Sequence, residues 1–129
     1  MTIELQMLAW AMLLGLVHIF ATSTAITRER GLRWNASARD TPMPPPGPLA
    51  GRLQRAQSNF METFPLFAAA AIMVVVAGRQ DSTTALAAQL YFWARVVYLP
   101  LYAAGVPYLR SLVWLVSLVA VLMLIAALL

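Results

Sequence analysis

The stretch RAQSNFMETFPLF, residues 55–67, carries the strongest structural signals in this chain. It leads into an apolar run, and its polar residues Arg55, Asn59 and Glu62 are separated by four and then three positions. In a helix that spacing places all three side chains on one face, and Arg52 joins them within about 80° of arc. A charge at membrane depth is costly without a partner, so we expect this face to turn toward protein and away from lipid.

Long apolar runs surround this stretch and predict the fold class. The chain has 129 residues, of which 61% are hydrophobic, and its mean hydropathy is +0.74. Soluble domains are closer to half apolar. Four runs are long enough to cross a hydrocarbon core of about 30 Å as helices: residues 3–26, 59–78, 83–106 and 109–129. We therefore predict an all-α, integral membrane four-helix bundle that forms a single domain over residues 1–129.

Turn-forming residues predict where these helices begin and end. Five prolines between residues 27 and 49 exclude a helix in that part of the first loop, so the second helix should begin near Leu49 and project into the cytoplasm. Gly78 should end it, and Asp81 or Ser82 should cap the third helix. Glu4 stands where a cleaved signal peptide would be basic, so we expect the first run to be retained as a span.

The distribution of arginine predicts the orientation in the membrane. All nine basic residues are arginine. Arg79 alone lies at one side, and seven lie at the other: Arg110 just past the turn between the last two runs, and six between the first two runs, namely Arg28, Arg30, Arg33, Arg39, Arg52 and Arg55. By the positive-inside rule those loops face the cytoplasm and both termini face the non-cytoplasmic side. A short basic loop offers no extended basic face, so we expect no nucleic-acid partner.

A second polar face is expected on the third helix. Its members are spaced by four, three and four residues: Tyr91, Arg95, Tyr98 and Tyr102. Arg95 lies within the bilayer and needs a counter-charge, and Glu62 is the best-placed acid, so we predict a structural Glu62–Arg95 ion pair. The two polar faces together are either an ion-pair network that locks helices or a pocket for a charged small molecule.

Three further residues could carry chemistry. Arg110 and Ser111 open the fourth helix, either as an interfacial anchor and cap or as a cation beside helix N-terminal amides, which favours an anion such as a thiolate or carboxylate. His18 lies midway through the first run and is the single histidine. We expect it to be a hydrogen-bonded packing residue. Without cysteine the chain has no Cys-ligated metal site, disulfide or Cys nucleophile, and we predict no metal.

Two motifs in this chain resemble the signatures of the MAPEG family, the membrane-associated proteins of eicosanoid and glutathione metabolism. The first is residues 55–67, read as R-A-Q-x-N-x-x-E-x-x-P-L-F. The second is Arg95-x-x-Tyr98-x-x-x-Tyr102, followed by a proline turn and Leu109-Arg110-Ser111. The resemblance covers nearly the whole chain and looks bacterial. It implies homotrimers of four-helix bundles, here in a bacterial inner membrane, with glutathione bound between adjacent subunits near the cytoplasmic face.

The same resemblance implies an activity and a set of site residues. Arg110 would stabilise the thiolate of glutathione, the co-substrate, and Ser111 would bind the thiol. The thiolate would attack a lipophilic electrophile that enters from the bilayer, or reduce a hydroperoxide, as in a glutathione transferase or peroxidase. The remaining glutathione contacts would be Arg28 (or, in its place, Arg30), Arg55, Gln57, Asn59, Glu62, Tyr98 and Tyr102.

Other functions remain open at this point. The family also includes a non-catalytic member that binds lipid and assists a partner enzyme, and this chain could be such an accessory protein. Thr63 stands where one family enzyme has a tyrosine, and the separation of eight residues between Tyr102 and Arg110 varies in the family, so the catalytic geometry is open. A small transporter is disfavoured, because the polar residues gather at one membrane face and form no midplane pathway.

Overall fold

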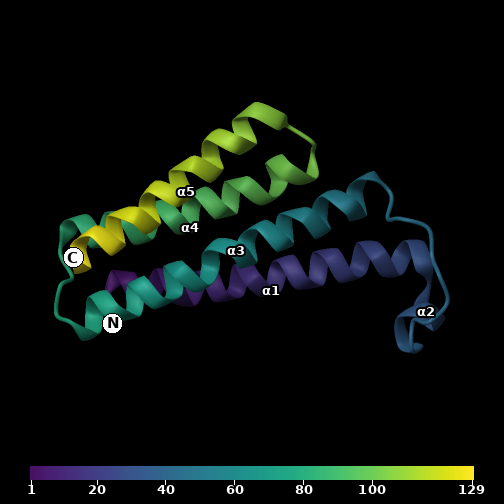
Figure 1. Cartoon of the computed structure of the whole chain (residues 1–129), viewed down its shortest axis with the longest axis horizontal. Helices are drawn as coiled ribbons and strands as arrows, with labels where there is room; N and C mark the ends of the chain where they lie inside the picture. Colours follow the sequence, from purple (N-terminus) through teal and green to yellow (C-terminus); the bar gives the residue numbers. More distant parts are fainter.

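The computed structural model describes all 129 residues and contains helices without any strand. The helices are α1 (Ile3–Arg30), α2 (Leu32–Ala36), α3 (Pro48–Val76), α4 (Ser82–Ala103) and α5 (Pro107–Leu128). Figure 1 shows four long helices lying roughly alongside one another, with the short α2 set apart at one end. The all-α class is therefore as predicted, while α2 is an addition.

Three helices, α1, α3 and α5, are long and apolar enough to cross a membrane, and they indicate an integral membrane protein. The helix α4 is 22 residues long, the same length as α5, but it is not among these three. It carries Thr83, Thr84, Gln89 and Arg95, which lower its hydropathy. At about 1.5 Å per residue, α4 is nevertheless about 33 Å long, which is enough to cross a hydrocarbon core of about 30 Å.

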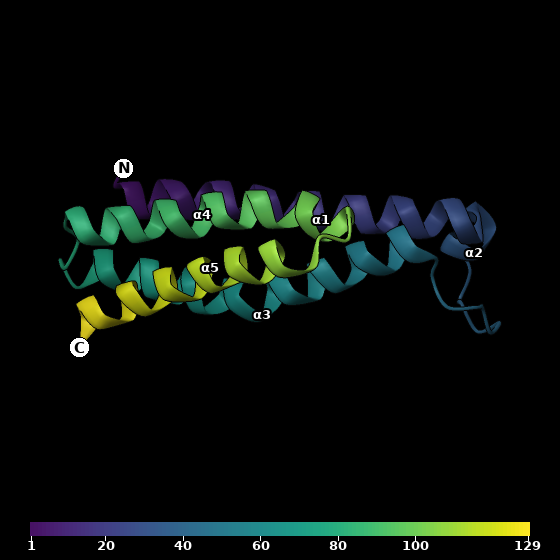
Figure 2. The same ribbon diagram turned by 90° about the horizontal axis from the view of Figure 1, so that it is seen from above.

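The four long helices form two pairs of unequal length. Figures 1 and 2 show α1 lying beside α3, and the α4–α5 hairpin covering the part of that pair nearest the two termini. The helices α1 and α3 have 28 and 29 residues, so each exceeds a member of the hairpin by about 10 Å. Their ends beside α2 therefore project past the tip of the hairpin.

The predicted turn residues act at the helix ends as expected. The helix α3 begins at Pro48, next to the expected Leu49, and a proline is tolerated there because the first-turn N–H has no helical partner. Gly78 follows its end with a φ of 68°, a conformation that favours glycine. Asp81 caps α4: its carboxylate accepts from the Thr84 N–H at 2.9 Å, and the Thr84 hydroxyl accepts from the Asp81 N–H at 2.8 Å.

The first loop differs from the sequence expectation. The helix α1 continues to Arg30, four residues beyond the predicted span, and α2 follows after Gly31 turns the chain with a φ of 91°. Trp34 on α2 lies between two guanidinium groups, those of Arg30 at 4.7 Å and Arg39 at 4.6 Å from its ring. These cation–π contacts hold the short helix in place, and only the proline-rich segment that follows is free of helix.

Small side chains bring the long helices together near the termini. Six of the twelve residues in the buried apolar cluster are alanine: Ala11, Ala70, Ala71, Ala87, Ala88 and Ala120. Phe67 stacks on Tyr91 with ring centroids 4.0 Å apart, and the Tyr91 hydroxyl bonds the Thr63 hydroxyl at 2.9 Å. The bundle interior is therefore closely packed over the half near the termini.

Candidate functional site

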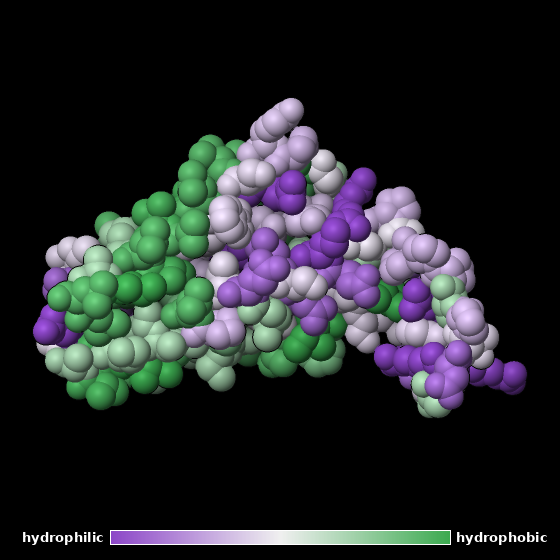
Figure 3. All heavy atoms as spheres, in the orientation of Figure 1, coloured by the Kyte–Doolittle hydropathy of each residue, from purple (hydrophilic) through white to green (hydrophobic).

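Hydrophilic side chains gather where the hairpin tip faces the first half of α3. Figure 3 shows an apolar surface over the half near the termini and a hydrophilic zone over the hairpin tip and the adjacent part of α3. The hairpin tip is the turn between α4 and α5, which contains Gly105 with a φ of 78°. The sequence-predicted residues of α3, α4 and α5 therefore meet at one place along the bundle.

Three arginines surround Tyr102 in a hollow at this place, which we call the arginine hollow. The Arg55 Nε donates to the Tyr102 hydroxyl at 3.3 Å, and the Arg110 guanidinium lies over the Tyr102 ring at 4.6 Å. Arg52 donates to the Ala103 carbonyl at 3.5 Å. The hollow has a volume of about 290 Å³, and no acidic side chain lines it. Three cations without a carboxylate favour an anionic ligand.

Arg52 is a part of this site that the sequence-based set of site residues omitted. It shares the helical face of Arg55, and the spacing that placed it there could have found it. Its guanidinium lies close to Gly105, within about 3 Å of where a β-carbon would stand. A glycine at the hairpin tip therefore lets a cation of α3 approach the α4–α5 turn closely.

Arg95 lies under the arginine hollow, entirely buried in the bundle. Its Nη1 donates to the Asn59 Oδ1 at 2.8 Å, and its guanidinium stacks on Tyr98 at 4.2 Å. The Nε and Nη2 atoms have no hydrogen-bond partner. Because Arg95 occupies the Asn59 carbonyl oxygen, the amide's two N–H donors face away from Arg95 and are available to a ligand.

Within the single chain, the Arg95 guanidinium donates to Asn59, and the predicted Glu62–Arg95 ion pair is not formed. Glu62 lies on the exposed surface of α3, one turn beyond Asn59. The two side chains are separated by about 60° around the helix, and α4 packs against the Asn59 edge of the face. The polar residues do share one face of α3, but of Asn59 and Glu62 only Asn59 faces inward and bonds Arg95.

Two of the three tyrosines of α4, Tyr98 and Tyr102, lie next to each other at this place. Tyr98 is buried at 2% exposure, and its ring meets Tyr102 edge-on with centroids 5.6 Å apart. Ser111 is exposed, and its hydroxyl donates to the Pro107 carbonyl at 3.3 Å, one turn earlier in α5. Of the sequence-predicted site residues, the structure thus gathers Arg55, Tyr102 and Arg110 in the lining of one hollow. Four more lie next to these residues without lining the hollow: Tyr98 against Tyr102, Ser111 after Arg110, and Asn59 and Glu62 one and two turns beyond Arg55.

Gln57 lies on the other flank of α3 and does not join this group. It is two residues from Arg55, which is about 200° around a helix. It lines a second hollow of about 400 Å³ together with Gln54, Arg30 and Trp34, which we call the glutamine hollow. The guanidinium of Arg30 also donates to the Pro44 carbonyl at 3.0 Å. The sequence contained no signal for Trp34 in a site, because its place depends on how α2 folds back.

Arg28 lines neither of these hollows. It borders a groove between α1 and the start of α3 instead. Of the two arginines that the sequence left as alternatives, Arg30 is therefore the one that shares a surface with Gln57.

His18 is a packing residue, as predicted, but it has no hydrogen bond. It is 1% exposed, its imidazole stacks on Phe60 with centroids 4.8 Å apart, and both ring nitrogens lack a partner. Its stacking partner across the α1–α3 contact is Phe60, whose side chain has no hydrogen-bonding group.

Comparison with known proteins identifies the family. None of the curated proteins compared with the chain matches it. A family model described as the MAPEG family matches residues 7–129, nearly the whole chain, including both motifs and every residue of the two hollows. The three long apolar helices agree with a membrane protein. The chain is thus an integral membrane protein that belongs to the MAPEG family.

Proposed function

We propose that this protein is a glutathione-dependent transferase or peroxidase that acts on lipophilic electrophiles or hydroperoxides. The observation that carries the proposal is the arginine hollow, where Arg52, Arg55 and Arg110 surround Tyr102 without an acidic side chain. Glutathione has two carboxylates and becomes more negative when its thiol ionises, so its charge matches this surface. Membership of a family concerned with glutathione and eicosanoid metabolism supports the same assignment.

Arg110 is the proposed catalytic cation, and Ser111 lies beside it at the start of α5. A free thiol has a pKa of about 8.5, and a nearby guanidinium favours its ionised form. The thiol proton leaves to solvent, and the sulfur forms a bond to the electrophilic carbon while the bond to the leaving group breaks. With a hydroperoxide, two glutathione molecules supply two electrons, and the products are the glutathione disulfide, an alcohol and water.

The residues that border the hollow would bind the rest of the tripeptide. The free N–H donors of Asn59 suit a carboxylate or a peptide carbonyl. Glu62 is the one carboxylate of α3 and lies exposed on the same side of that helix, so it suits the ammonium group of glutathione. The hydroxyls of Tyr98 and Tyr102 complete the polar lining from α4.

We propose a homotrimer in which the glutamine hollow of one subunit meets the arginine hollow of the next. The two hollows lie on opposite flanks of α3, and a head-to-tail contact of this kind closes into a ring of three when each subunit is rotated by a third of a turn from the last. Gln57 and Arg30 would then reach the glutathione of the neighbouring subunit. Arg30 takes the place of Arg28 in this arrangement, because Arg28 lines neither hollow.

For the membrane we propose four spans in one domain, with α4 as the span that pairs with α5. The arginine hollow then lies at the tip of the hairpin, at the same end as the basic first loop. By the positive-inside rule this end faces the cytoplasm, and both termini face the other side of what is proposed to be a bacterial inner membrane. Electrophiles dissolved in the bilayer can reach the hollow from the lipid side.

The test compares Arg110→Leu with Arg79→Leu in purified protein. Arg79 is an exposed arginine at the far end of the molecule, so its loss is a matched control. Conjugation of glutathione to a chromogenic aryl halide should fall about 100-fold in Arg110→Leu, because a donor to the developing charge is lost. Binding of S-hexylglutathione, which has no ionisable thiol, should weaken by at most about tenfold in calorimetry.

Two outcomes contradict this assignment. Equal conjugation rates for Arg110→Leu and wild type would remove Arg110 from catalysis. A folded wild-type protein that binds neither glutathione nor S-hexylglutathione would favour the non-catalytic, lipid-binding or accessory role instead.

A further inference from the structure

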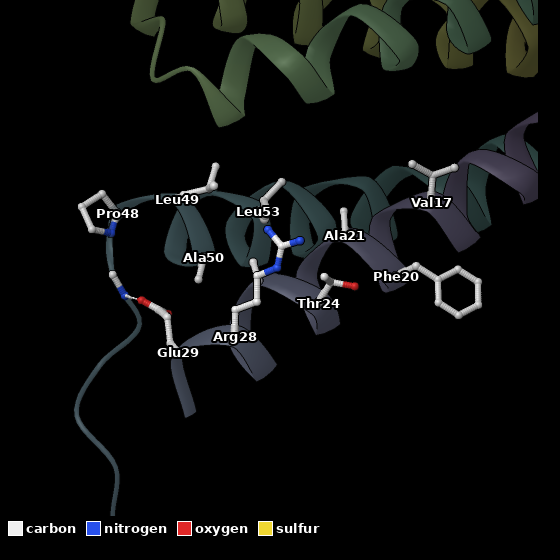
Figure 4. Close-up of a pocket in the computed structure, with 12 residues that line it drawn as sticks. Val17, Phe20, Ala21, Thr24, Arg28, Glu29, Pro48, Leu49, Ala50 and Leu53 are labelled. Atoms are coloured by element: carbon white, nitrogen blue, oxygen red, sulfur yellow. Dashed lines mark hydrogen bonds between the residues drawn. The ribbon is translucent and has the colours of Figure 1, made fainter. Parts of the chain in front are cut away.

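A third hollow, larger than the two proposed glutathione surfaces, lies away from them. It is a groove of about 700 Å³ between the second half of α1 and the start of α3. Its walls are mostly apolar, with Val17, Phe20 and Ala21 on α1 and Leu49 and Leu53 on α3. Figure 4 shows these side chains along the two helices, with Phe20 and Val17 toward one end of the groove and Pro48 toward the other.

No other part of the chain covers this groove. The α4–α5 hairpin stops short of the end where α1 and α3 project, as Figures 1 and 2 show. Phe20 is 66% exposed and Leu49 is 53% exposed, although both belong to helices that cross the membrane by length and composition. In a bilayer, this slot between two helices is therefore open to lipid.

Arg28 is the charged residue at the polar end of the groove. Figure 4 shows its guanidinium pointing into the groove, toward Leu53 and beside Thr24. The neighbouring acid, Glu29, is engaged elsewhere, because its carboxylate accepts from the Gly47 N–H at 2.7 Å. The guanidinium groups of Arg30 and Arg39 donate to backbone carbonyl oxygens. That of Arg28 makes no hydrogen bond within the chain, so it can bind an external anion.

The depth of Arg28 matches that of lipid phosphates. From Ile3, Ala21 is about 27 Å along the helix and Arg28 about 38 Å, at about 1.5 Å per residue. A hydrocarbon core of about 30 Å that begins at Ile3 would contain Val17, Phe20 and Ala21. Arg28 would lie about 8 Å beyond it, in the headgroup layer.

From this arrangement we infer that the α1–α3 groove is a binding site for an anionic phospholipid. An acyl chain lies against Phe20 and Ala21, and the phosphate pairs with Arg28. The Thr24 hydroxyl is one helical turn from Arg28 on the same face and can donate to the same phosphate. Charge complementarity selects an anionic headgroup over a zwitterionic one, since a basic cluster beside a span attracts anionic lipid.

The headgroup test uses native mass spectrometry of the purified protein with equal amounts of phosphatidylglycerol and phosphatidylcholine of the same chain length. The wild type should retain phosphatidylglycerol in preference, and Arg28→Gln should reduce that preference about fivefold. Arg33→Gln is the matched control: it removes the same charge from the same loop, but Arg33 is exposed on α2 and lines no part of the groove. It should retain the wild-type preference.

The acyl-chain test fills the groove with a ring. Ala21→Phe should lower the retention of both lipids, whereas Ala69→Phe, at an exposed position of α3 outside the groove, should not. Ala21 lines neither glutathione surface, so S-hexylglutathione binding provides a separate measure that the variant is folded. Should the protein bind no glutathione, the melting temperature provides that measure, and the lipid result still decides this inference.

Three results would overturn the inference. Equal losses in Arg28→Gln and Arg33→Gln would mean diffuse attraction to the basic loop. Equal retention of the two lipids by the wild type would remove the headgroup specificity. A smaller assembly mass for Arg28→Gln or Ala21→Phe would mean that the groove is covered by another copy of the chain.

Discussion

At the residue scale, Arg95 stands out as a charged side chain buried inside the bundle with few hydrogen-bond partners. It is fully buried, with one hydrogen bond to Asn59 and two nitrogens without partners. Replacing a buried charge by a well-packed apolar side chain is often neutral or stabilising. Its presence is therefore better explained by what it does to Asn59 and Tyr98, which border the arginine hollow, than by stability.

Arg95→Met tests this view. We expect the free energy of unfolding to stay level or rise by about 1 kcal/mol, because a partly unpaired guanidinium is removed. Glutathione affinity should fall about tenfold, because the Asn59 amide loses the bond that orients its donors. Thermal unfolding in detergent and calorimetric titration measure the two effects. A stability loss with unchanged affinity would make Arg95 a purely structural residue.

At the element scale, the turn between α3 and α4 joins three parts of the chain. Asp81 caps α4 through Thr84, and the Thr84 hydroxyl also donates to the buried carboxylate of Glu4 on α1 at 2.5 Å. The beginning of α1 and the beginning of α4 are thus tied together at the end of the bundle that holds the termini. These side-chain hydrogen bonds hold the α4–α5 hairpin against the α1–α3 pair.

Removing the cap should weaken this end without touching the site. Asp81→Ala should lower the free energy of unfolding by about 1 kcal/mol, the usual effect of losing an N-cap side chain. Ser82→Ala is the control, since Ser82 follows the cap and its side chain makes no capping bond. Thermal unfolding in detergent compares the two, and equal melting temperatures would show that the capping box adds nothing to stability.

At the scale of the whole molecule, two hollows with different linings lie on opposite flanks of α3. One holds three arginines and a tyrosine, and the other holds two glutamines with Arg30 and Trp34. A ring of three chains would bring unlike hollows together at every junction, whereas a two-fold dimer would pair each surface with itself.

Mixed assemblies test this arrangement. Arg110→Leu impairs one hollow and Gln57→Leu the other. In randomly mixed trimers about a quarter of all junctions should combine two intact hollows, because three quarters of the trimers are mixed and each contains one such junction. Conjugation activity of the co-expressed pair should therefore approach about a quarter of wild type. Activity equal to the mean of the two separate variants would rule out a site shared between subunits.

Much of the fold could be predicted from local patterns. The start of α3 near Leu49, the end at Gly78 and the Asp81 cap depend on neighbouring residues, and the structure has all three. The helix α2 could not be predicted, because Trp34 is held by Arg30 and Arg39, which approach it only after the loop has folded. Among the candidate site residues, the motifs single out Arg55, Tyr102 and Arg110, and the structure brings these three into the lining of one hollow.

By itself the sequence determined the helical class, the membrane environment and the polar stripe, because apolar run length, helical periodicity and turn chemistry are local properties of the chain. The tertiary structure decided which members of that stripe turn inward. Because α4 packs against one edge of α3, Arg95 forms its hydrogen bond with Asn59, and Glu62 stays exposed. Helix packing also separated Gln57 from Arg55 and Arg28 from Arg30, because residues close in sequence face different neighbours once helices pack on two sides.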